Sequence, residues 1–402
     1  MHLVTDAKLG IPDPHILAFL RHAAQHSPYY REFDWAKNLL AGLPIRLHDI
    51  PVTDKIDLRK NTSAFRSDFD PPALGRVMTK YTSGSTGTQT EISKNEFHYA
   101  VNARENARLI AGWRLDDHKV SVIKEPPSKD FATGTTAIRH LRSGRVVHRI
   151  YTNSIAELDQ FIKLHQPSHV LTTPSMMSEL LDKPLEFGFL RLAETTYEAV
   201  PPDFASKIAR LDGCSHLDIY GAVETAMLAT KCVVCGKYHL AKSSNHLEIL
   251  TEDGRNAGEG ELGRVVVTVF SNYAMPLIRY DLGDYARLTK LSPCTPGEIS
   301  LVEIVGREIM MFITSDGKKV WPFIDAGTIE RLGIKRYKLI QISPLDVEFH
   351  YQMREDGKTL SKDILQNVAD LELSGNFNIL PMLTDQFPRT QSGKYLMHER
   401  RM

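Results

Sequence analysis

The stretch YTSGSTGTQT, from Tyr81 to Thr90, decides how the rest of the chain is interpreted. Gly84 and Gly87 allow the backbone to turn and to approach an anion closely. Hydroxyl groups add side-chain donors beside the exposed backbone N–H groups; they belong to Ser83, Ser85, Thr86 and Thr88. The stretch therefore predicts a loop that binds the phosphates of a nucleoside triphosphate, although a run of Ser, Thr and Gly is also typical of a flexible loop.

Two familiar nucleotide motifs are absent from the sequence. The P-loop pattern requires Gly-x-x-x-x-Gly-Lys-Ser/Thr, and its one tempting match, at Gly393-Lys394, lacks the first glycine and the hydroxyl residue. A Gly-x-Gly-x-x-Gly run occurs at Gly258, Gly260 and Gly263, but a dinucleotide fingerprint follows a strand and opens a helix. Here a polar segment precedes the glycines and the strand-like RVVVTVF follows, so we predict a turn between strands.

Length and charge set broad limits on the protein. A chain of 402 residues suggests about two or three domains and can bury a substantial core. The formal net charge is zero, so we expect no nucleic-acid partner. The N-terminus has no leader pattern, and no stretch approaches the roughly twenty apolar residues that span a bilayer. We therefore expect a cytoplasmic protein with no membrane partner.

Hydrophobic periodicity predicts an α/β fold: a large layered N-terminal domain and a small α+β C-terminal domain. PDPHILAFLRHAAQ has the apolar spacing of an amphipathic helix, and Ser154 with Glu157 forms a capping box before another. HVLTT and SMMSELL then read as a strand and a helix, the alternation expected of a parallel sheet. Beyond Gly306, KLIQIS and DVEFHYQ alternate like strands and LSKDILQNVADLE is helical. We place the domains at residues 1–306 and 307–402.

Four further segments follow the loop in the sequence and support its interpretation as a nucleotide-binding loop. They are DIYGAVETA (218–226), YDLGDYARL (280–288), VGRE (305–308) and PRTQSGKYL (388–396). Together with the loop they resemble the adenylate-forming ligase superfamily. Within the superfamily, the chain most resembles the phenylacetate-CoA ligase branch. The signs of this branch are HSPYYREF, PVTDKIDL and Thr90, a position where many relatives outside the branch carry lysine. The resemblance runs from about Ser27 to the C-terminus and implies a small C-terminal lid domain that is mobile.

The resemblance implies roles for individual residues. Lys394 would be catalytic, bridging the substrate carboxylate and the α-phosphate as a compact ammonium. Glu224 would hold Mg²⁺ against the phosphates. Asp284 and Arg307 would contact the ribose. The remaining nucleotide contacts, around the adenine, would be Glu198, Asp218, Tyr220 and Gly221.

Two positions depart from the pattern of the relatives. Val223 stands where a Thr or Ser is usual, and the loss of one hydrogen bond to a charged group can cost about 1.5–3 kcal/mol. Gln89 replaces a proline, which changes the stiffness of the loop and removes no ligand. Slow adenylation is one expected consequence of Val223.

The cysteines form a second constellation. Cys232-x-x-Cys235 followed by His239 has metal-ligand spacing, and Cys294 lies where the phenylacetate-CoA ligase branch often has another cysteine. Three thiolates and one imidazole would close a tetrahedral structural Zn²⁺ site, with no position left for water. The alternative is a set of unrelated thiols. Cys214 is interpreted as an ordinary small buried residue.

The resemblance implies an acid–thiol ligase that uses ATP, Mg²⁺ and coenzyme A and acts on a small aryl or arylacetic acid. One alternative is an enzyme that loads an acyl group onto the phosphopantetheine thiol of an acyl carrier protein. Another is a zinc-stabilised binding protein on a decayed ligase scaffold, for which Val223 and Gln89 are the motivation. A homodimer is common among relatives of this branch.

Overall fold

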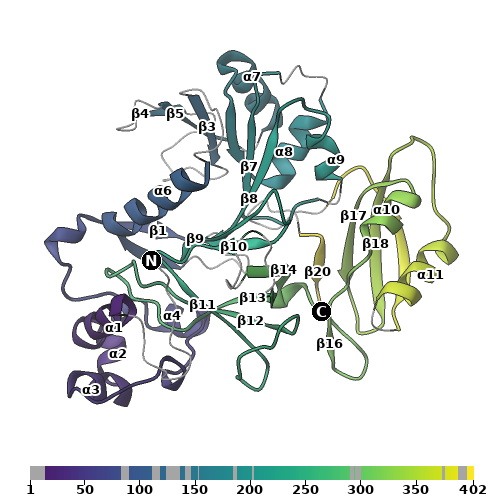
Figure 1. The fold of residues 1–402 in the computed structure, drawn as a ribbon. Helices are drawn as coiled ribbons and strands as arrows, with labels where there is room; N and C mark the ends of the chain where they lie inside the picture. The colour runs from purple at the N-terminus through teal and green to yellow at the C-terminus, as the bar shows by residue number, and fades with distance from the viewer. Residues whose placement is uncertain are drawn as a thin grey trace. The chain divides into compact units, whose positions relative to one another are not determined.

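The computed structural model describes residues 14–82, 90–110, 118–123, 136–140, 146–152, 154–183, 188–201, 203–289, 294, 300–373, 376–387 and 396–402 (Figure 1). The chain divides into two compact units, each made of two stretches of sequence. The first unit comprises residues 1–112 and 219–305, and the second comprises residues 113–218 and 306–402. Strand β8 (Ser215–Ala222) has residues in both units.

The first unit begins with helices and continues with antiparallel strands. Its described helices are α1 (Pro14–His26), α2 (Pro28–Arg31), α3 (Asp34–Leu40), α4 (Lys55–Lys60), α5 (Thr62–Phe65) and α6 (Glu96–Ile110). Strands β1 (Val77–Tyr81) and β2 (Glu91–Asn95) form a separate hairpin. The larger sheet has the order β11-β12-β13-β14-β10-β9-β8. Its other strands are β9 (Ala226–Lys231), β10 (Tyr238–Leu240), β11 (His246–Leu250), β12 (Leu262–Thr268), β13 (Tyr280–Thr289) and β14 (Ser300–Arg307).

One hydrophobic core joins the helices of the first unit to its strands. Phe19 and Leu20 from α1 are completely buried in it, together with Ile92 from β2 and Val267 from β12. The buried Tyr30 hydroxyl oxygen accepts a hydrogen bond across this core from the backbone N–H of Ile278, at 3.1 Å. The N-terminal helices therefore form part of the body that supports the β1–β2 hairpin.

Residues 113–218 of the second unit form a mainly parallel sheet with helices between its strands. The strand order is β7-β6-β3-β5-β4, and only the β4–β5 pair is antiparallel. The elements are β3 (His118–Ile123), β4 (Thr136–His140), β5 (Val146–Tyr151), α7 (Ile155–His165), β6 (His169–Thr172), α8 (Pro174–Leu181), β7 (Leu192–Thr196) and α9 (Phe204–Ile208). Helix α8 begins at a proline, and the hydroxyl of Thr173 caps it by accepting from the N–H of Met176.

Residues 306–402 contribute a four-stranded sheet of order β19-β18-β17-β20. The elements are β15 (Phe312–Ile313), β16 (Lys319–Val320), α10 (Ala326–Arg331), β17 (Ile334–Gln341), β18 (Asp346–Met353), α11 (Lys362–Glu372), β19 (Asn378–Leu383) and β20 (His398–Arg400). Helix α11 packs against β19 and buries Leu365 and Val368 in a core with Phe349. This core is separate from those of the other elements.

The predicted α/β fold class is confirmed, and the strands and helices predicted from periodicity are present. One prediction needs correction. The hydroxyl of Ser154 accepts from the N–H of Glu157, as predicted. The Glu157 carboxylate, however, accepts from the Thr152 hydroxyl at 2.5 Å. The N–H of Ser154 also donates to the Thr152 hydroxyl. Thr152 therefore replaces the second half of the capping box. The domain boundary at residues 306 and 307 stays a prediction.

Among the described residues, no helix has both the length and the apolar character that crossing a membrane requires.

Candidate functional site

The predicted phosphate loop connects β1 to β2. Its predicted ligands Ser83, Gly84, Ser85, Thr86, Gly87 and Thr88 lie outside the described residues. The base of the loop is held by Thr82 and Thr90: the N–H of Thr82 donates to the Thr90 carbonyl at 2.9 Å, and the N–H of Thr90 donates to the Thr82 hydroxyl at 3.0 Å. Arg59 donates to the Thr90 hydroxyl at 3.2 Å. The hairpin thus fixes where the loop begins and ends.

Two predicted nucleotide contacts come together in the first unit. The Tyr220 hydroxyl donates to the Asp284 carboxylate at 2.8 Å, although the residues are 64 positions apart. Asp284 is buried on β13, and Tyr220 is half-buried on β8. A hydrogen bond to a carboxylate is stronger than one between neutral groups, so Tyr220 orients this side chain. The pair brings an aromatic ring and a carboxylate acceptor to one place.

Gly221 has a steric reason to be glycine. A Cβ atom added there would lie 2.1 Å from the carbonyl oxygen of Ala226. The pairing of β8 with β9 is irregular between Tyr220 and Gly221, and Ala226 has a left-handed backbone with φ 58°. The close approach of the two strands therefore requires a residue without a side chain.

Glu224 lies in the tight turn between β8 and β9. It is only 8% exposed, and its carboxylate makes no hydrogen bond or ion pair with the described residues. A buried carboxylate without a partner is costly unless a cation neutralises it. Mg²⁺ favours one or two carboxylates together with phosphate oxygens, so the donor chemistry of Glu224 fits the predicted ion.

Asp218, on β8, is held by a neighbouring strand. The Thr195 hydroxyl on β7 donates to the Asp218 carboxylate at 2.6 Å and lies 2.8 Å from Nε2 of His216. Since a hydroxyl has one proton, Thr195 must accept from Nε2–H of His216. This arrangement fixes the tautomer of His216 and the direction of Asp218.

Two further predicted residues have described positions. Glu198 follows β7 and accepts from the backbone N–H of Ser175 at 3.4 Å, so it caps the start of α8. Arg307 ends β14. Lys394, the predicted catalytic residue, lies outside the described residues. The structure therefore leaves the roles of Arg307 and Lys394 as predictions from the sequence.

The four predicted zinc ligands form one cluster in the first unit. The sulfur atoms of Cys232, Cys235 and Cys294 and a ring nitrogen of His239 all lie within 4.8 Å of one another. Cys232 and Cys235 flank a tight turn in which the N–H of Gly236 donates to the Cys232 carbonyl at 2.9 Å. His239 follows on β10, and Cys294 comes from beyond β13.

The spacing of these atoms fits a tetrahedral metal site. Two thiolates on zinc, each about 2.3 Å from the ion, are about 3.8 Å apart in tetrahedral geometry. The Cys232 and Cys294 sulfur atoms are 3.8 Å apart, and the Cys235 sulfur lies 3.3 Å from Nε2 of His239. Cys214 lies outside the cluster, and burial raises the pKa of its thiol to about 11. Cys214 is half-buried against a core of the second unit, so it is less buried than predicted.

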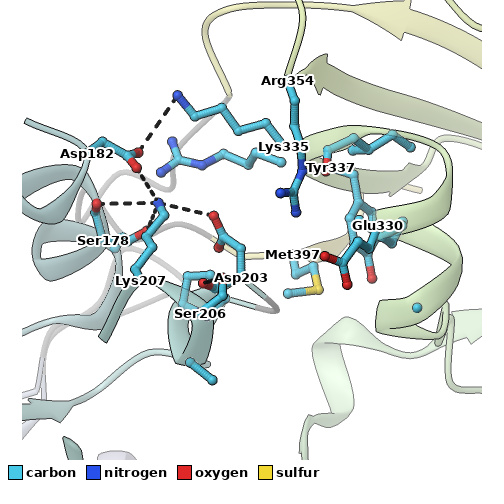
Figure 2. Close-up of a pocket in the computed structure, with 17 residues that line it drawn as sticks. Ser178, Asp182, Asp203, Ser206, Lys207, Glu330, Lys335, Tyr337, Arg354 and Met397 are labelled. Carbon is cyan, nitrogen blue, oxygen red and sulfur yellow. Dashed lines mark hydrogen bonds and ion pairs between the residues drawn. The ribbon is translucent and has the colours of Figure 1, made fainter. Parts of the chain in front are cut away.

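A pocket of about 240 Å³ in the second unit contains none of the predicted site residues (Figure 2). Lys207 lies beside it, and its ammonium is 2.8 Å from Asp182, 3.1 Å from Asp203 and 2.6 Å from the Ser178 hydroxyl. Two carboxylates already neutralise this lysine, and Lys335 approaches Asp182 at 3.8 Å from β17. The pocket's buried cation is thus fully partnered, and we assign it no chemistry.

Sequence reasoning missed Thr195 and His216, which orient Asp218. Thr195 belongs to none of the segments that carry the resemblance, and its contact depends on β7 lying next to β8. A strand order was needed to find it. The His216-x-Asp218 spacing was the one available signal, since alternate residues of a strand face the same side.

Known proteins resemble this chain in sequence and in fold. The chain is 27% identical over 323 residues to the phenylacetate-coenzyme A ligases of Pseudomonas putida and of Escherichia coli strain K12, covering 75% of this chain and 71% of each relative. Among solved structures, a 2-hydroxyisobutyryl-CoA ligase in the postadenylation state, in complex with R3-HIB-AMP, matches with a TM-score of 0.70. That match has 18% identity and covers 98% of this chain and 93% of the other.

The chain is therefore similar to phenylacetate-CoA ligases. It shares the fold of the adenylate-forming ligases, which confirms the predicted resemblance. No family model matches the chain. Among the described residues, Tyr220 contacts Asp284. The four cysteine and histidine ligands form a second group.

Proposed function

We propose that this protein joins a carboxylic acid to the thiol of coenzyme A in two steps. A carboxylate oxygen of the acid bonds to the α-phosphorus of ATP, and the bond from that phosphorus to the pyrophosphate oxygen breaks. The thiol sulfur then bonds to the carbonyl carbon of the acyl-adenylate, the thiol proton is lost, and the bond from the carbonyl carbon to the AMP oxygen breaks. The products are a thioester, AMP and pyrophosphate.

The observation that carries the proposal is the Tyr220–Asp284 hydrogen bond in a fold shared with acyl-CoA ligases. It joins two separated segments that the resemblance assigns to one nucleotide. Asp284 would accept from a ribose hydroxyl, and the Tyr220 ring would stack on the adenine. Asp218, oriented by Thr195, would accept from the exocyclic amine of that base. The relatives named phenylacetate-coenzyme A ligase support an aryl or arylacetic acid as substrate.

The chemistry is mainly positioning and electrostatic stabilisation, because negative charge grows on phosphate oxygens as pyrophosphate departs. Mg²⁺ held by Glu224 would neutralise part of that charge. A zinc ion on Cys232, Cys235, His239 and Cys294 would be structural, since four protein ligands complete its tetrahedron. Such a site would tie the turn between β9 and β10 to the segment that follows β13.

Hydroxylamine trapping tests this proposal. Hydroxylamine converts an acyl-adenylate into a hydroxamate, so it reports the first step without coenzyme A. We expect hydroxamate and pyrophosphate to form with ATP and arylacetic or benzoic acids, and more slowly with fatty or amino acids. The same panel with coenzyme A should give thioesters. No acid-dependent pyrophosphate release with any member of the panel would contradict the proposal and favour a binding protein on a decayed scaffold.

A further inference from the structure

Lys94 is a buried cation that no carboxylate neutralises directly. The side chain is 3% exposed, and no hydrogen bond or ion pair reaches its ammonium from the described part of the chain. Its Nζ lies 5.8 Å from the centroid of the Tyr99 ring, a weak interaction compared with the loss of hydration. Leaving a charge in the interior without a partner destabilises a fold. Lys94 therefore needs an explanation outside the packing of the core.

The direction of the Lys94 side chain follows from its strand. Residues two apart on a strand face the same side, so Lys94 faces the interior as Ile92 does. Ile92 is completely buried in the main core of the first unit, and Val223, next to Glu224, packs against that same core. Glu224 acts on Lys94 electrostatically: burial lowers the pKa of Lys94 to about 7, and the charge of Glu224 partly offsets this.

Lys94 and Glu224 are thus two buried opposite charges that are close but form no ion pair. His98, which interacts electrostatically with Lys94, has a buried ring nitrogen, Nε2, without a hydrogen-bond partner among the described residues. The other ring nitrogen of His98 bonds to the Ser271 hydroxyl at 2.8 Å. Unsatisfied buried polar atoms indicate a bound water or ligand. The ligand that suits a carboxylate and an ammonium together carries both a divalent cation and anionic oxygens.

We propose that the Lys94 ammonium donates to a phosphate oxygen of the magnesium nucleotide and is a further catalytic residue of the adenylation step. This inference rests on the proposed function. As the bond from the α-phosphorus to pyrophosphate breaks, the ammonium stabilises the charge that grows on the departing oxygens and keeps its proton. Lys94 lies on the strand that leaves the predicted phosphate loop, which favours a phosphate oxygen over the carboxylate of the acid.

Lys94→Met removes the charge and keeps most of the volume, and Lys80→Met is the matched control. Lys80 lies on β1, pairs in register with Ile92 and is exposed. We expect Lys94→Met to lower kcat/KM for MgATP in acid-dependent pyrophosphate release by about tenfold or more, the loss of one charged hydrogen bond. Thioester formation from supplied acyl-adenylate should not change. Lys80→Met should match the wild type in both assays.

The melting temperature supplies a second readout. Without nucleotide, Lys94→Met should melt at a higher temperature than the wild type, because it removes a buried charge that no direct ion pair compensates. MgATP should raise its melting temperature less than that of the wild type. Three outcomes would overturn the inference. Lys94→Met could melt at a lower temperature than the wild type, which would make the lysine structural. Alternatively, the rate of adenylation could be unchanged, or only the KM for the acid could rise. If the wild type binds MgATP but activates no acid, the proposed function is wrong. The MgATP-induced shift in melting temperature would still test whether Lys94 contacts the nucleotide.

Discussion

At the scale of single residues, the candidate site depends on hydroxyl groups that orient carboxylates. Tyr220 donates to Asp284, and Thr195 donates to Asp218. Asp284 is 7% exposed and Asp218 is 6% exposed, so each hydrogen bond forms away from bulk water, where it is stronger. The two acids therefore have defined directions before any nucleotide binds, which lowers the entropy cost of binding.

Tyr220→Phe should raise the KM for ATP by about tenfold, since it removes one hydrogen bond to a charged group and keeps the aromatic ring. The turnover number should change less, because the bond is present in the ground state as well as the transition state. Initial rates of acid-dependent pyrophosphate release measure both. Tyr29→Phe is the control, since the Tyr29 ring stacks on Phe65 at 3.9 Å and is not part of the site. An unchanged KM for ATP would contradict the role of Tyr220.

At the scale of elements, the cysteine and histidine cluster described above joins the β9–β10 connection to Cys294, which follows β13. β10 has three residues, and in the register it pairs with β14 through Tyr238 and His239. Such a short strand has few backbone hydrogen bonds to hold it. A metal ion on the four ligands would therefore supply much of the local stability.

Protein purified without chelator should contain about one zinc per chain, and Cys235→Ser should contain far less. We expect the variant to melt several degrees lower, because a structural zinc binds the folded state selectively. Elemental analysis and thermal denaturation measure the two effects. Cys214→Ser should keep its zinc, because Cys214 lies outside the cluster. A zinc content that Cys235→Ser leaves unchanged would exclude this site.

The sequence predicts elements well where local patterns decide them. Helix α1 and the cysteine ligands of the β9–β10 turn follow from apolar period and ligand spacing. It predicts contacts between elements poorly. The partner of Asp218 depends on strand order, and the burial of Lys94 depends on which core its hairpin joins. In the same way, Glu157 bonds to Thr152, because a nearby hydroxyl competes with the backbone for its carboxylate.

At the scale of the whole molecule, the two half-reactions should depend on different parts of the chain. The resemblance implies that the small C-terminal domain rotates between them and that Lys394 serves only the first. Lys394→Ala should therefore abolish acid-dependent pyrophosphate release and leave thioester formation from supplied acyl-adenylate largely intact. Single-turnover assays of each half-reaction provide the measurement. Equal loss of both would show that Lys394 is not specific to adenylation.

The crowding at Gly221 bears on how such chains diverge. A methyl group there would collide with the Ala226 carbonyl whether or not the protein performs any chemistry. A descendant that had abandoned catalysis would still inherit this glycine, since the hairpin cannot close without it. The fold does not require Lys94 and Glu224 in this way, so both residues could be substituted once catalysis is lost. Among related sequences, the pair of buried charges would therefore be present in active enzymes and absent from catalytically inactive relatives. The glycine would be present in both.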